Sequence, residues 1–209
     1  MLRVLTHINT VYTSVSYIIQ DDTDKCCWII DVGDYDDIRD SISGYQLKGV
    51  LLTHVHYDHI YGLNALLADH PMVPVYTNLN GHDSLYSPSD NLSAYHDENF
   101  VLATDNVIVV SEGDSILMGD ETLEVYETPG HDFSCLTFRL GDYLFTGDAY
   151  IPGVKVYTKL QNGNKEDAER SLMRITDMLS DEVKVMPGHH SIIFTDCTSG
   201  CTILQARGN

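Results

Sequence analysis

The sequence predicts an α/β protein in which two β-sheets pack face to face and helices cover their outer faces, an αββα sandwich. Three observations lead to this fold class. Each half of the chain runs through several strand-like segments before a helix-like one. With 209 residues, 43% of them hydrophobic, the chain can bury the core that such a sandwich requires. No internal repeat, low-complexity tract or linker interrupts it, so we expect residues 1–209 to form a single domain.

Short runs rich in β-branched and aromatic residues predict the strands in order along the chain. In the first half they lie at residues 3–8, 14–20, 26–31, 48–53 and 73–77. In the second half they lie at residues 107–110, 114–118, 121–127, 134–140, 143–147 and 183–187. Helices are expected at residues 35–43, 60–69, 80–86 and 165–180. The last is the clearest, because Leu172, Ile175 and Leu179 recur at helical spacing.

Four metal-competent side chains follow one of these strands within six residues: His54, His56, Asp58 and His59. Open α/β sheets place their ligand sites at the carboxyl ends of strands. On an extended backbone His54 and His56 point the same way, and the next turn directs Asp58 and His59 toward a second centre. Because three imidazoles and a carboxylate are costly to desolvate together without a cation, the run predicts a metal site.

Three further strand-like runs end in a glycine followed by one metal-competent side chain. These side chains are His131, Asp148 and His189. Glycine allows the tight turn and close backbone approach that aim such a side chain into a shared pocket. One such turn is a weak signal, but three of them after the His/Asp cluster indicate a common site.

Together these residues resemble the pattern of the metallo-β-lactamase fold hydrolases, His-x-His-x-Asp-His followed by His, Asp and His. The resemblance runs from about residue 4 to residue 193 and implies that fold, with two metal ions per chain. It implies that the first ion is held by His54, His56 and His131. It implies that the second is held by Asp58, His59 and His189, with Asp148 bridging both. Zinc is the default ion for imidazole-rich sites, although iron and manganese accept the same ligands.

Two zinc ions would create a bridging hydroxide near neutral pH. Asp58 would orient this hydroxide and pass its proton onward during the reaction. We therefore expect a dinuclear zinc hydrolase that cleaves a small acyl compound, which is a thioester, an ester or a lactone. The carboxylate at Asp148 is similar to that of the hydroxyacylglutathione hydrolase, or glyoxalase II, branch.

Lys155 and Tyr157 resemble the Lys-x-Tyr element with which those hydrolases hold the peptide part of their substrate. One charged and one aromatic residue in an alternating strand is an equally good interpretation of this pair. Those hydrolases also carry a C-terminal helical region that completes the glutathione site. Because this chain ends about twenty residues after His189, we expect a substrate smaller than a glutathione thioester.

Two other function classes were weighed. An oxidoreductase of the same fold uses one iron to oxidise glutathione persulfide, and His54, His131 and Asp148 supply its His/His/Asp set. The other ligand positions do not exclude this alternative, because members of the fold can keep unused ligands. A non-catalytic binding protein is disfavoured, since all seven ligand positions hold competent residues.

Composition bounds the partners of the chain. A net charge of −19, which two divalent ions would bring only to −15, predicts that nucleic acids do not bind. No apolar run of 18 residues exists, so no membrane span is expected, and the start of the chain does not resemble a signal peptide. We expect a cytoplasmic enzyme with a small-molecule substrate; the sequence does not indicate the oligomeric state.

The remaining features are interpreted as structural. The five cysteines are expected to be free thiols in a reducing compartment. A small metal or redox pair is the alternative for Cys197 and Cys201, and it is disfavoured because no further His or Cys cluster accompanies them. Segment 83–105 is polar and irregular, and is either a cap over the site or a plain insertion. The other histidines are not expected to bind metal: His7, His70, His82, His96 and His190.

Overall fold

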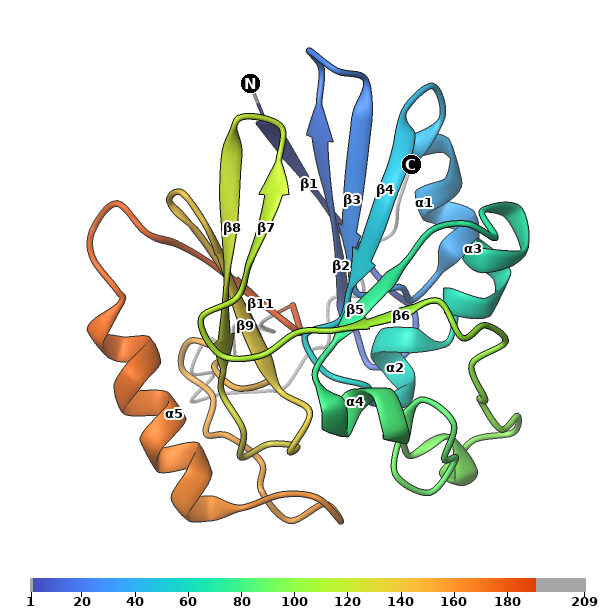
Figure 1. Ribbon diagram of the computed structural model, residues 1–209. Coiled ribbons are helices and arrows are strands. Elements are labelled where there is room, and N and C mark those ends of the chain that lie inside the picture. The colour runs from blue at the N-terminus through green and yellow to red at the C-terminus, as the bar shows by residue number, and fades with distance from the viewer. Residues whose placement is uncertain (1, 191–209) are drawn as a thin grey trace, which may run out of the picture.

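The computed structural model describes residues 2–190, which form two mixed β-sheets packed face to face with helices outside (Figure 1). The six-stranded sheet contains β1 (Leu2–Ile8), β2 (Val15–Asp21), β3 (Cys26–Ile30), β4 (Gln46–Leu51), β5 (Val75–Thr77) and β6 (Val107–Val109), in that order. The five-stranded sheet has the order β11 (Lys184–Pro187), β10 (Tyr143–Gly147), β9 (Leu136–Leu140), β8 (Glu121–Glu127) and β7 (Ser115–Met118). The predicted αββα sandwich is confirmed.

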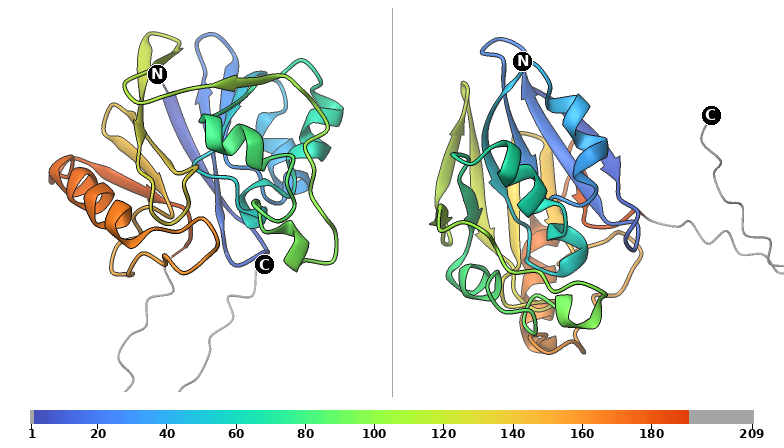
Figure 2. Two further views of the ribbon diagram at one scale, coloured as in Figure 1. Left: turned by 60° about the horizontal axis from the view of Figure 1, so that its bottom comes forward. Right: turned by 90° about the vertical axis from the view of Figure 1, so that its right-hand side faces the viewer.

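The helices are α1 (Tyr35–Ile42), α2 (Tyr57–Ile60), α3 (Leu63–Asp69), α4 (Leu79–Ser84) and α5 (Lys165–Asp177), with a short 3-10 helix η1 (Ser93–Tyr95). α5 lies outside the five-stranded sheet, while α1 and α3 lie on the opposite side of the molecule (Figures 1 and 2). Within the described residues no helix combines the length and the apolar character needed to cross a membrane.

Alternation along β3 shows how one strand serves two cores. Trp28 and Ile30 point into the cluster between the sheets, and Cys27 and Ile29 point into the cluster under α1 and α3. Successive side chains of a strand face opposite sides of its sheet. Because both faces are covered, all five residues of β3 are buried, and the strand is apolar throughout.

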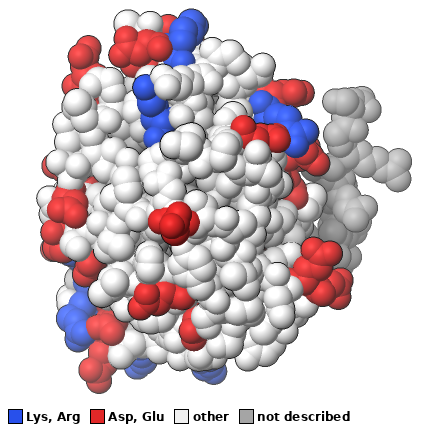
Figure 3. Space-filling view, turned by 45° about the vertical axis from the view of Figure 1, so that its right-hand side comes forward, with Lys and Arg blue, Asp and Glu red and all other residues white. Residues whose placement is uncertain are grey.

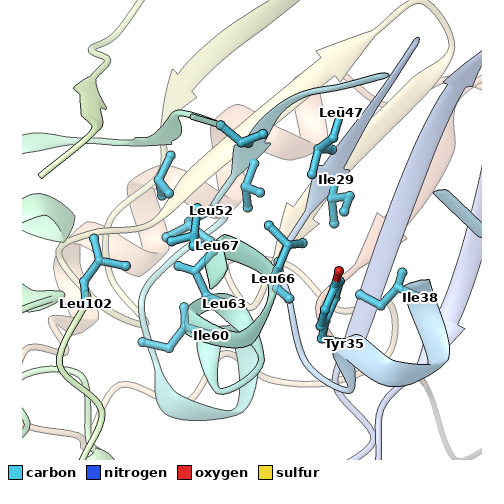
Figure 4. Close-up of a cluster of buried hydrophobic side chains, with 14 of the residues drawn as sticks. Ile29, Tyr35, Ile38, Leu47, Leu52, Ile60, Leu63, Leu66, Leu67 and Leu102 are labelled. Atoms are coloured by element: carbon cyan, nitrogen blue, oxygen red, sulfur yellow. The ribbon is translucent and has the colours of Figure 1, made fainter. Parts of the chain in front are cut away.

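The outer cluster joins the six-stranded sheet to its helices (Figure 4). Ile38 of α1 and Leu63 and Leu66 of α3 are fully buried there against Ile29 and its neighbours. Burying one such side chain contributes about 1.5–3 kcal/mol relative to leaving it exposed. These contacts fix α3, and through it the turn that carries the predicted metal cluster.

The structure corrects one predicted helix. Residues 60–69 were expected to form a single helix, but α2 and α3 are separate and meet around Gly62. There the chain passes so close to the end of β3 that a Cβ on Gly62 would lie 1.9 Å from the Gly33 carbonyl oxygen. The Gly62 amide also donates to the Val32 carbonyl, at 3.1 Å. The chain therefore packs against the segment after β3 at Gly62 instead of continuing as one helix. The same contact holds the turn that carries His56, Asp58 and His59 beside β3.

Four strands deliver the predicted ligands to one end of the sandwich. β4, β8, β10 and β11 end within four residues of His54, His131, Asp148 and His189 respectively. A bridge between Ser14 and His189, supported by a 2.7 Å hydrogen bond from the Val15 amide to the Gly188 carbonyl, joins the two sheets there. Residues far apart in sequence are therefore held together by strand pairing.

Three described cysteines, Cys26, Cys27 and Cys135, are buried free thiols, as expected. Cys197 and Cys201 lie outside the described residues.

Candidate metal centre

Seven predicted ligands converge at this end of the sandwich. Their potential ligand atoms fall into three groups, each with all its atoms within 4.8 Å of one another. The first group is His54 with His56 and His131, the second is Asp58 with His59 and His189, and a third, His54 with His59 and Asp148, lies between them. Every one of the seven residues belongs to at least one group.

The first group is a buried set of three imidazoles. The ring nitrogens His131 Nε2 and His56 Nδ1 face each other at 3.0 Å, and the rings of His54 and His131 lie 5.2 Å apart. His54 Nε2 is buried without a hydrogen-bond partner among the described residues. A buried ring nitrogen is costly to leave unpaired, and a cation between the three rings would satisfy it.

The second group combines two imidazoles with a carboxylate. His59 Nε2 and His189 Nε2 lie 3.4 Å apart, and Asp58 Oδ2 is 3.5 Å from the first and 3.3 Å from the second. The turn formed by α2 places Asp58 and His59 here, away from His56, as the sequence predicted.

Asp148 lies between the two groups. Its Oδ2 is 3.4 Å from His131 Nε2 in the first group and 3.2 Å from His189 Nε2 in the second. Its Oδ1 is buried without a hydrogen-bond partner among the described residues. Gly188 makes room for this carboxylate, because a Cβ there would lie 2.2 Å from Asp148 Oδ1.

Each imidazole is held by its other ring nitrogen. His131 Nδ1 lies 2.9 Å from the Tyr157 carbonyl oxygen, and His189 Nδ1 lies 2.9 Å from that of Tyr12. His54 Nδ1 lies 3.2 Å from the Thr53 hydroxyl. An acceptor on one nitrogen keeps a proton there, so the inward-facing nitrogen is the one that is free of a proton when a metal binds.

Asp31 holds a fourth imidazole, and its part in the site was not predicted. Its Oδ2 lies 2.9 Å from His59 Nδ1 and also accepts the Thr53 hydroxyl, while its Oδ1 accepts the Thr53 amide. Asp31 is 1% exposed and has φ of +56°, in the left-handed region that Asp and Asn adopt more readily than most residues. Its sequence signal is a lone carboxylate directly after an entirely apolar strand.

Asp132 is the second carboxylate that was missed. Its Oδ1 accepts the Ser134 amide at 2.8 Å, and its Oδ2 lies 3.4 Å from His56 Nε2. This buried side chain therefore faces the outer nitrogen of His56. An acidic residue directly after a predicted ligand, His131, was the available signal.

The charges of the cluster depend on one another. Burial lowers the pKa of His54 well below its usual value, and the neighbouring imidazoles lower it further. Burial also opposes the charged form of His59, but Asp58 and Asp31 outweigh it and raise the pKa to about 9. Burial of His189 is likewise outweighed, by hydrogen bonds to Asp148 and Asp58 that raise the pKa to about 11. The carboxylates around His59 and His189 thus favour positive charge beside them, which protons supply when no metal is bound.

This donor set fits divalent cations. It offers five imidazoles and two carboxylates. Two of their atoms, His54 Nε2 and Asp148 Oδ1, are buried without a hydrogen-bond partner among the described residues. A mixture of imidazole and carboxylate suits zinc, iron and manganese. The donor atoms therefore favour a bound divalent metal ion, but they do not distinguish among these three metals.

The two residues predicted to contact the substrate lie beside the first group. Lys155 and Tyr157 line a cavity of about 60 Å³ together with His131 and Asp148. Tyr157 is 55% exposed, while its carbonyl oxygen holds His131. A role in substrate binding stays a prediction.

Segment 83–105 is anchored in the core and also reaches toward the site. Phe100 and Leu102 are buried under the six-stranded sheet's helices. The His96 ring stacks on Tyr57, beside Asp58, with a centroid separation of 4.1 Å. That the segment caps the site stays a prediction.

Comparison with known proteins identifies the family. Residues 9–190 match the family described as the metallo-beta-lactamase superfamily. The chain belongs to this superfamily. Its histidine-rich metal-site candidates are those of a metallo-hydrolase of the metallo-beta-lactamase superfamily.

Two curated relatives in this superfamily are named as hydrolases. A probable polyketide biosynthesis zinc-dependent hydrolase, BaeB, from Bacillus velezensis is 28% identical over 86% of this chain and 74% of its own. A hydroxyacylglutathione hydrolase from Enterobacter sp. is 29% identical over 83% of this chain. The chain spans only 60% of that relative's length.

Solved structures of the superfamily share the fold. A B3 metallo-beta-lactamase, BLEG-1, has a TM-score of 0.80 at 23% identity and covers 90% of this chain and 92% of its own. A protein crystallised in a di-iron-bound form has a TM-score of 0.74 at 23% identity, with the same coverage of both chains. At these identities the likeness shows the fold alone.

Proposed function

We propose that this protein is a dinuclear zinc hydrolase that cleaves a small acyl compound by the chemistry of the glyoxalase II branch. The observation that carries the proposal is the position of Asp148, within 3.4 Å of His131 in one group and 3.2 Å of His189 in the other. His54, His56 and His131 would hold one ion and Asp58, His59 and His189 the other, with Asp148 shared between them. The zinc-dependent relative supports the choice of metal.

The reaction is addition of water to an acyl group. Two bound zinc ions would acidify a shared water and polarise the acyl carbonyl. The hydroxyl joins the acyl carbon, the C–S or C–O bond breaks, and the remaining proton leaves with the thiol or alcohol. Asp58 Oδ2, between His59 and His189, is placed to orient the water and to carry that proton.

The nature of the acyl compound is part of the proposal. The hydroxyacylglutathione hydrolase among the relatives supports a thioester. We expect the enzyme to be cytoplasmic and its substrate to be small. Exposed acidic side chains are spread over the face in Figure 3 and outnumber the basic ones there, which supports exclusion of polyanions such as RNA.

The alternative is a mononuclear iron oxidoreductase that uses His54, His131 and Asp148. It leaves Asp58, His59 and His189 without a role, although their atoms lie close enough to hold an ion of their own. Elemental analysis of protein purified without added metal, followed by an ester and thioester panel, tests the two. About two zinc ions per chain with acyl hydrolysis supports the hydrolase, and one iron without hydrolysis overturns it.

Zinc binding is expected to release protons. With pKa values raised to about 9 and about 11, His59 and His189 are protonated at pH 7.5, and a metal needs their free lone pairs. Adding zinc to metal-free protein in weak buffer with a pH indicator should release about three protons per chain, two from these imidazoles and one from the shared water. The release should decline as the pH rises through 9, where His59 loses its proton before zinc is added. Release of only about one proton at pH 7.5 would remove both residues from the ligand set.

Lys155→Ala is expected to raise KM for an anionic thioester about tenfold and to leave a neutral ester nearly unaffected. The reason is that Lys155 lines the small cavity beside His131 and Asp148, where its ammonium group can meet a carboxylate of the substrate. Steady-state kinetics on both substrates measures the difference. Equal effects on the two substrates would exclude Lys155 from substrate recognition.

A further inference from the structure

A groove of about 870 Å³ lies between residues 150–159 and α5, and is called here the arm groove. One wall is the irregular segment that contains Lys155, Tyr157 and Lys159, and the other is the first two turns of α5. Apart from Lys155, the proposed chemistry at the metal centre uses no side chain of this groove.

The arm groove is connected to the first metal group. Residues 154–157 line both the groove and the small cavity that contains His131 and Asp148. The hydrogen-bond contact of 2.9 Å between His131 Nδ1 and the Tyr157 carbonyl ties the wall to a predicted ligand. A molecule with its reacting bond at the first group can therefore continue into the groove.

The walls of the arm groove expose apolar side chains that a folded protein usually covers. Val154 is 54% exposed, Tyr157 55% and Leu172 37%, and all three line the groove. Contact with an apolar chain would remove this surface from water, which is favourable by about 25 cal/mol per Å². The lining therefore suits an extended, largely uncharged arm.

The groove also gathers positive charge in an acidic protein. Lys155, Lys159 and Lys165 line it, three of the 12 lysines and arginines in a chain of net charge −19. Lys165 is paired with Glu169 at 3.6 Å, whereas Lys155 and Lys159 form no salt bridge within residues 2–190. The Cα atoms of these two lysines lie at most about 14 Å apart, so their flexible side chains can reach one dianion, which two ammonium groups match better than a single carboxylate.

We propose that the arm groove binds the leaving-group arm of the substrate, a long thiol that ends in a phosphate held by Lys159 with Lys155. This proposal rests on the proposed acyl hydrolase function and specifies its substrate class; it replaces the expectation that the substrate is smaller than a glutathione thioester. The acyl carbon lies at the metal groups, the uncharged part of the arm packs on Val154 and Leu172, and the phosphate reaches the lysines.

Three acetyl thioesters test the proposal. S-acetyl-4′-phosphopantetheine and S-acetylpantetheine have the same arm and differ only in the phosphate, while S-acetylglutathione carries carboxylates instead. We expect the zinc-loaded enzyme to favour the phosphorylated compound at least tenfold in kcat/KM over both others. Lys159→Gln should raise KM for that compound about tenfold, leave kcat within twofold, and leave S-acetylpantetheine unaffected. The matched control is Lys48→Gln, an exposed lysine on β4 far from these residues in sequence.

Binding separates this proposal from the proposed function. Calorimetry with metal-free protein should show that 4′-phosphopantetheine binds and that Lys159→Gln weakens it about tenfold. If 4′-phosphopantetheine binds in this way but no thioester is hydrolysed, the proposed hydrolase function is wrong and the proposal for the arm groove is supported. Equal kcat/KM for the phosphorylated and neutral thioesters, preference for the glutathione compound, or equal effects of Lys159→Gln and Lys48→Gln would overturn the groove proposal. Self-association through the groove, seen as binding that weakens with protein concentration, would also overturn it.

Discussion

Asp148→Asn is expected to lower acyl hydrolysis by roughly 10³-fold, the size of loss that follows removal of one preorganised electrostatic partner from a site. The amide keeps the shape of the side chain but removes the negative charge that lies within 3.4 Å of His131 and 3.2 Å of His189. Two cations held on either side of a neutral amide repel each other more strongly. The second ion, which relies on Asp58, His59 and His189, should therefore be lost first.

The measurement combines zinc content, turnover and far-UV circular dichroism. We expect about one zinc per chain at moderate zinc concentration and an unchanged spectrum, because Asp148 lies beyond the end of β10 and outside the hydrophobic clusters. Asp142→Asn makes the same chemical change at an exposed position before the same strand, and should retain both ions. If Asp148→Asn keeps two ions and near-normal turnover, Asp148 does not bridge them.

The fold and the inward-facing side chains of the site were predictable because their signals are local. Each expected strand lies within two residues of an observed one at both ends. His131, Asp148 and His189 each follow a glycine at a strand end, and a short β-like run with such an ending can be recognised without knowledge of what it pairs with. The clustering itself then follows from the sheet order.

The groups that hold those side chains were not predictable, because they depend on long-range pairing. Tyr12 supplies a carbonyl oxygen to His189, 177 residues away, and a main-chain acceptor leaves no trace in residue type. Asp31 contacts His59 across 28 residues, since β3 lies beside β4 in the sheet. The split between α2 and α3 has the same origin: it reflects contact of Gly62 with Gly33, not local helix propensity.

Asp31 joins three structural elements through one carboxylate. Its Oδ1 accepts the Thr53 amide at 2.8 Å, and its Oδ2 accepts the Thr53 hydroxyl at 2.6 Å and faces His59 Nδ1 at 2.9 Å. With all of these donors present, both oxygens must act as acceptors, which only a carboxylate provides. Thr53 in turn faces His54 Nδ1, so a change at Asp31 reaches one predicted ligand in each metal group.

Asp31→Asn should therefore damage both metal binding and stability. If the new amide group faces His59, the ring must accept there, and its proton moves to Nε2, the nitrogen that faces the metal. If the amide is turned round, its N–H meets the Thr53 N–H with no acceptor between them. We expect zinc affinity at the second centre, measured by chelator competition, to fall ~10–100-fold. The free energy of unfolding of the metal-free protein, from denaturant titration, should fall by about 1–3 kcal/mol.

Backbone strain does not confound this substitution, because asparagine accepts the positive φ of +56° at position 31 about as readily as aspartate. Asp24→Asn, at an exposed position before the same strand, gives the matched change of charge and should alter neither quantity. Loss of stability with unchanged zinc affinity would make Asp31 a structural residue only. Loss of zinc affinity that glutamate at position 31 partly restores would show that the carboxylate sets the proton position on His59, since the longer side chain keeps two acceptor oxygens in the same pocket.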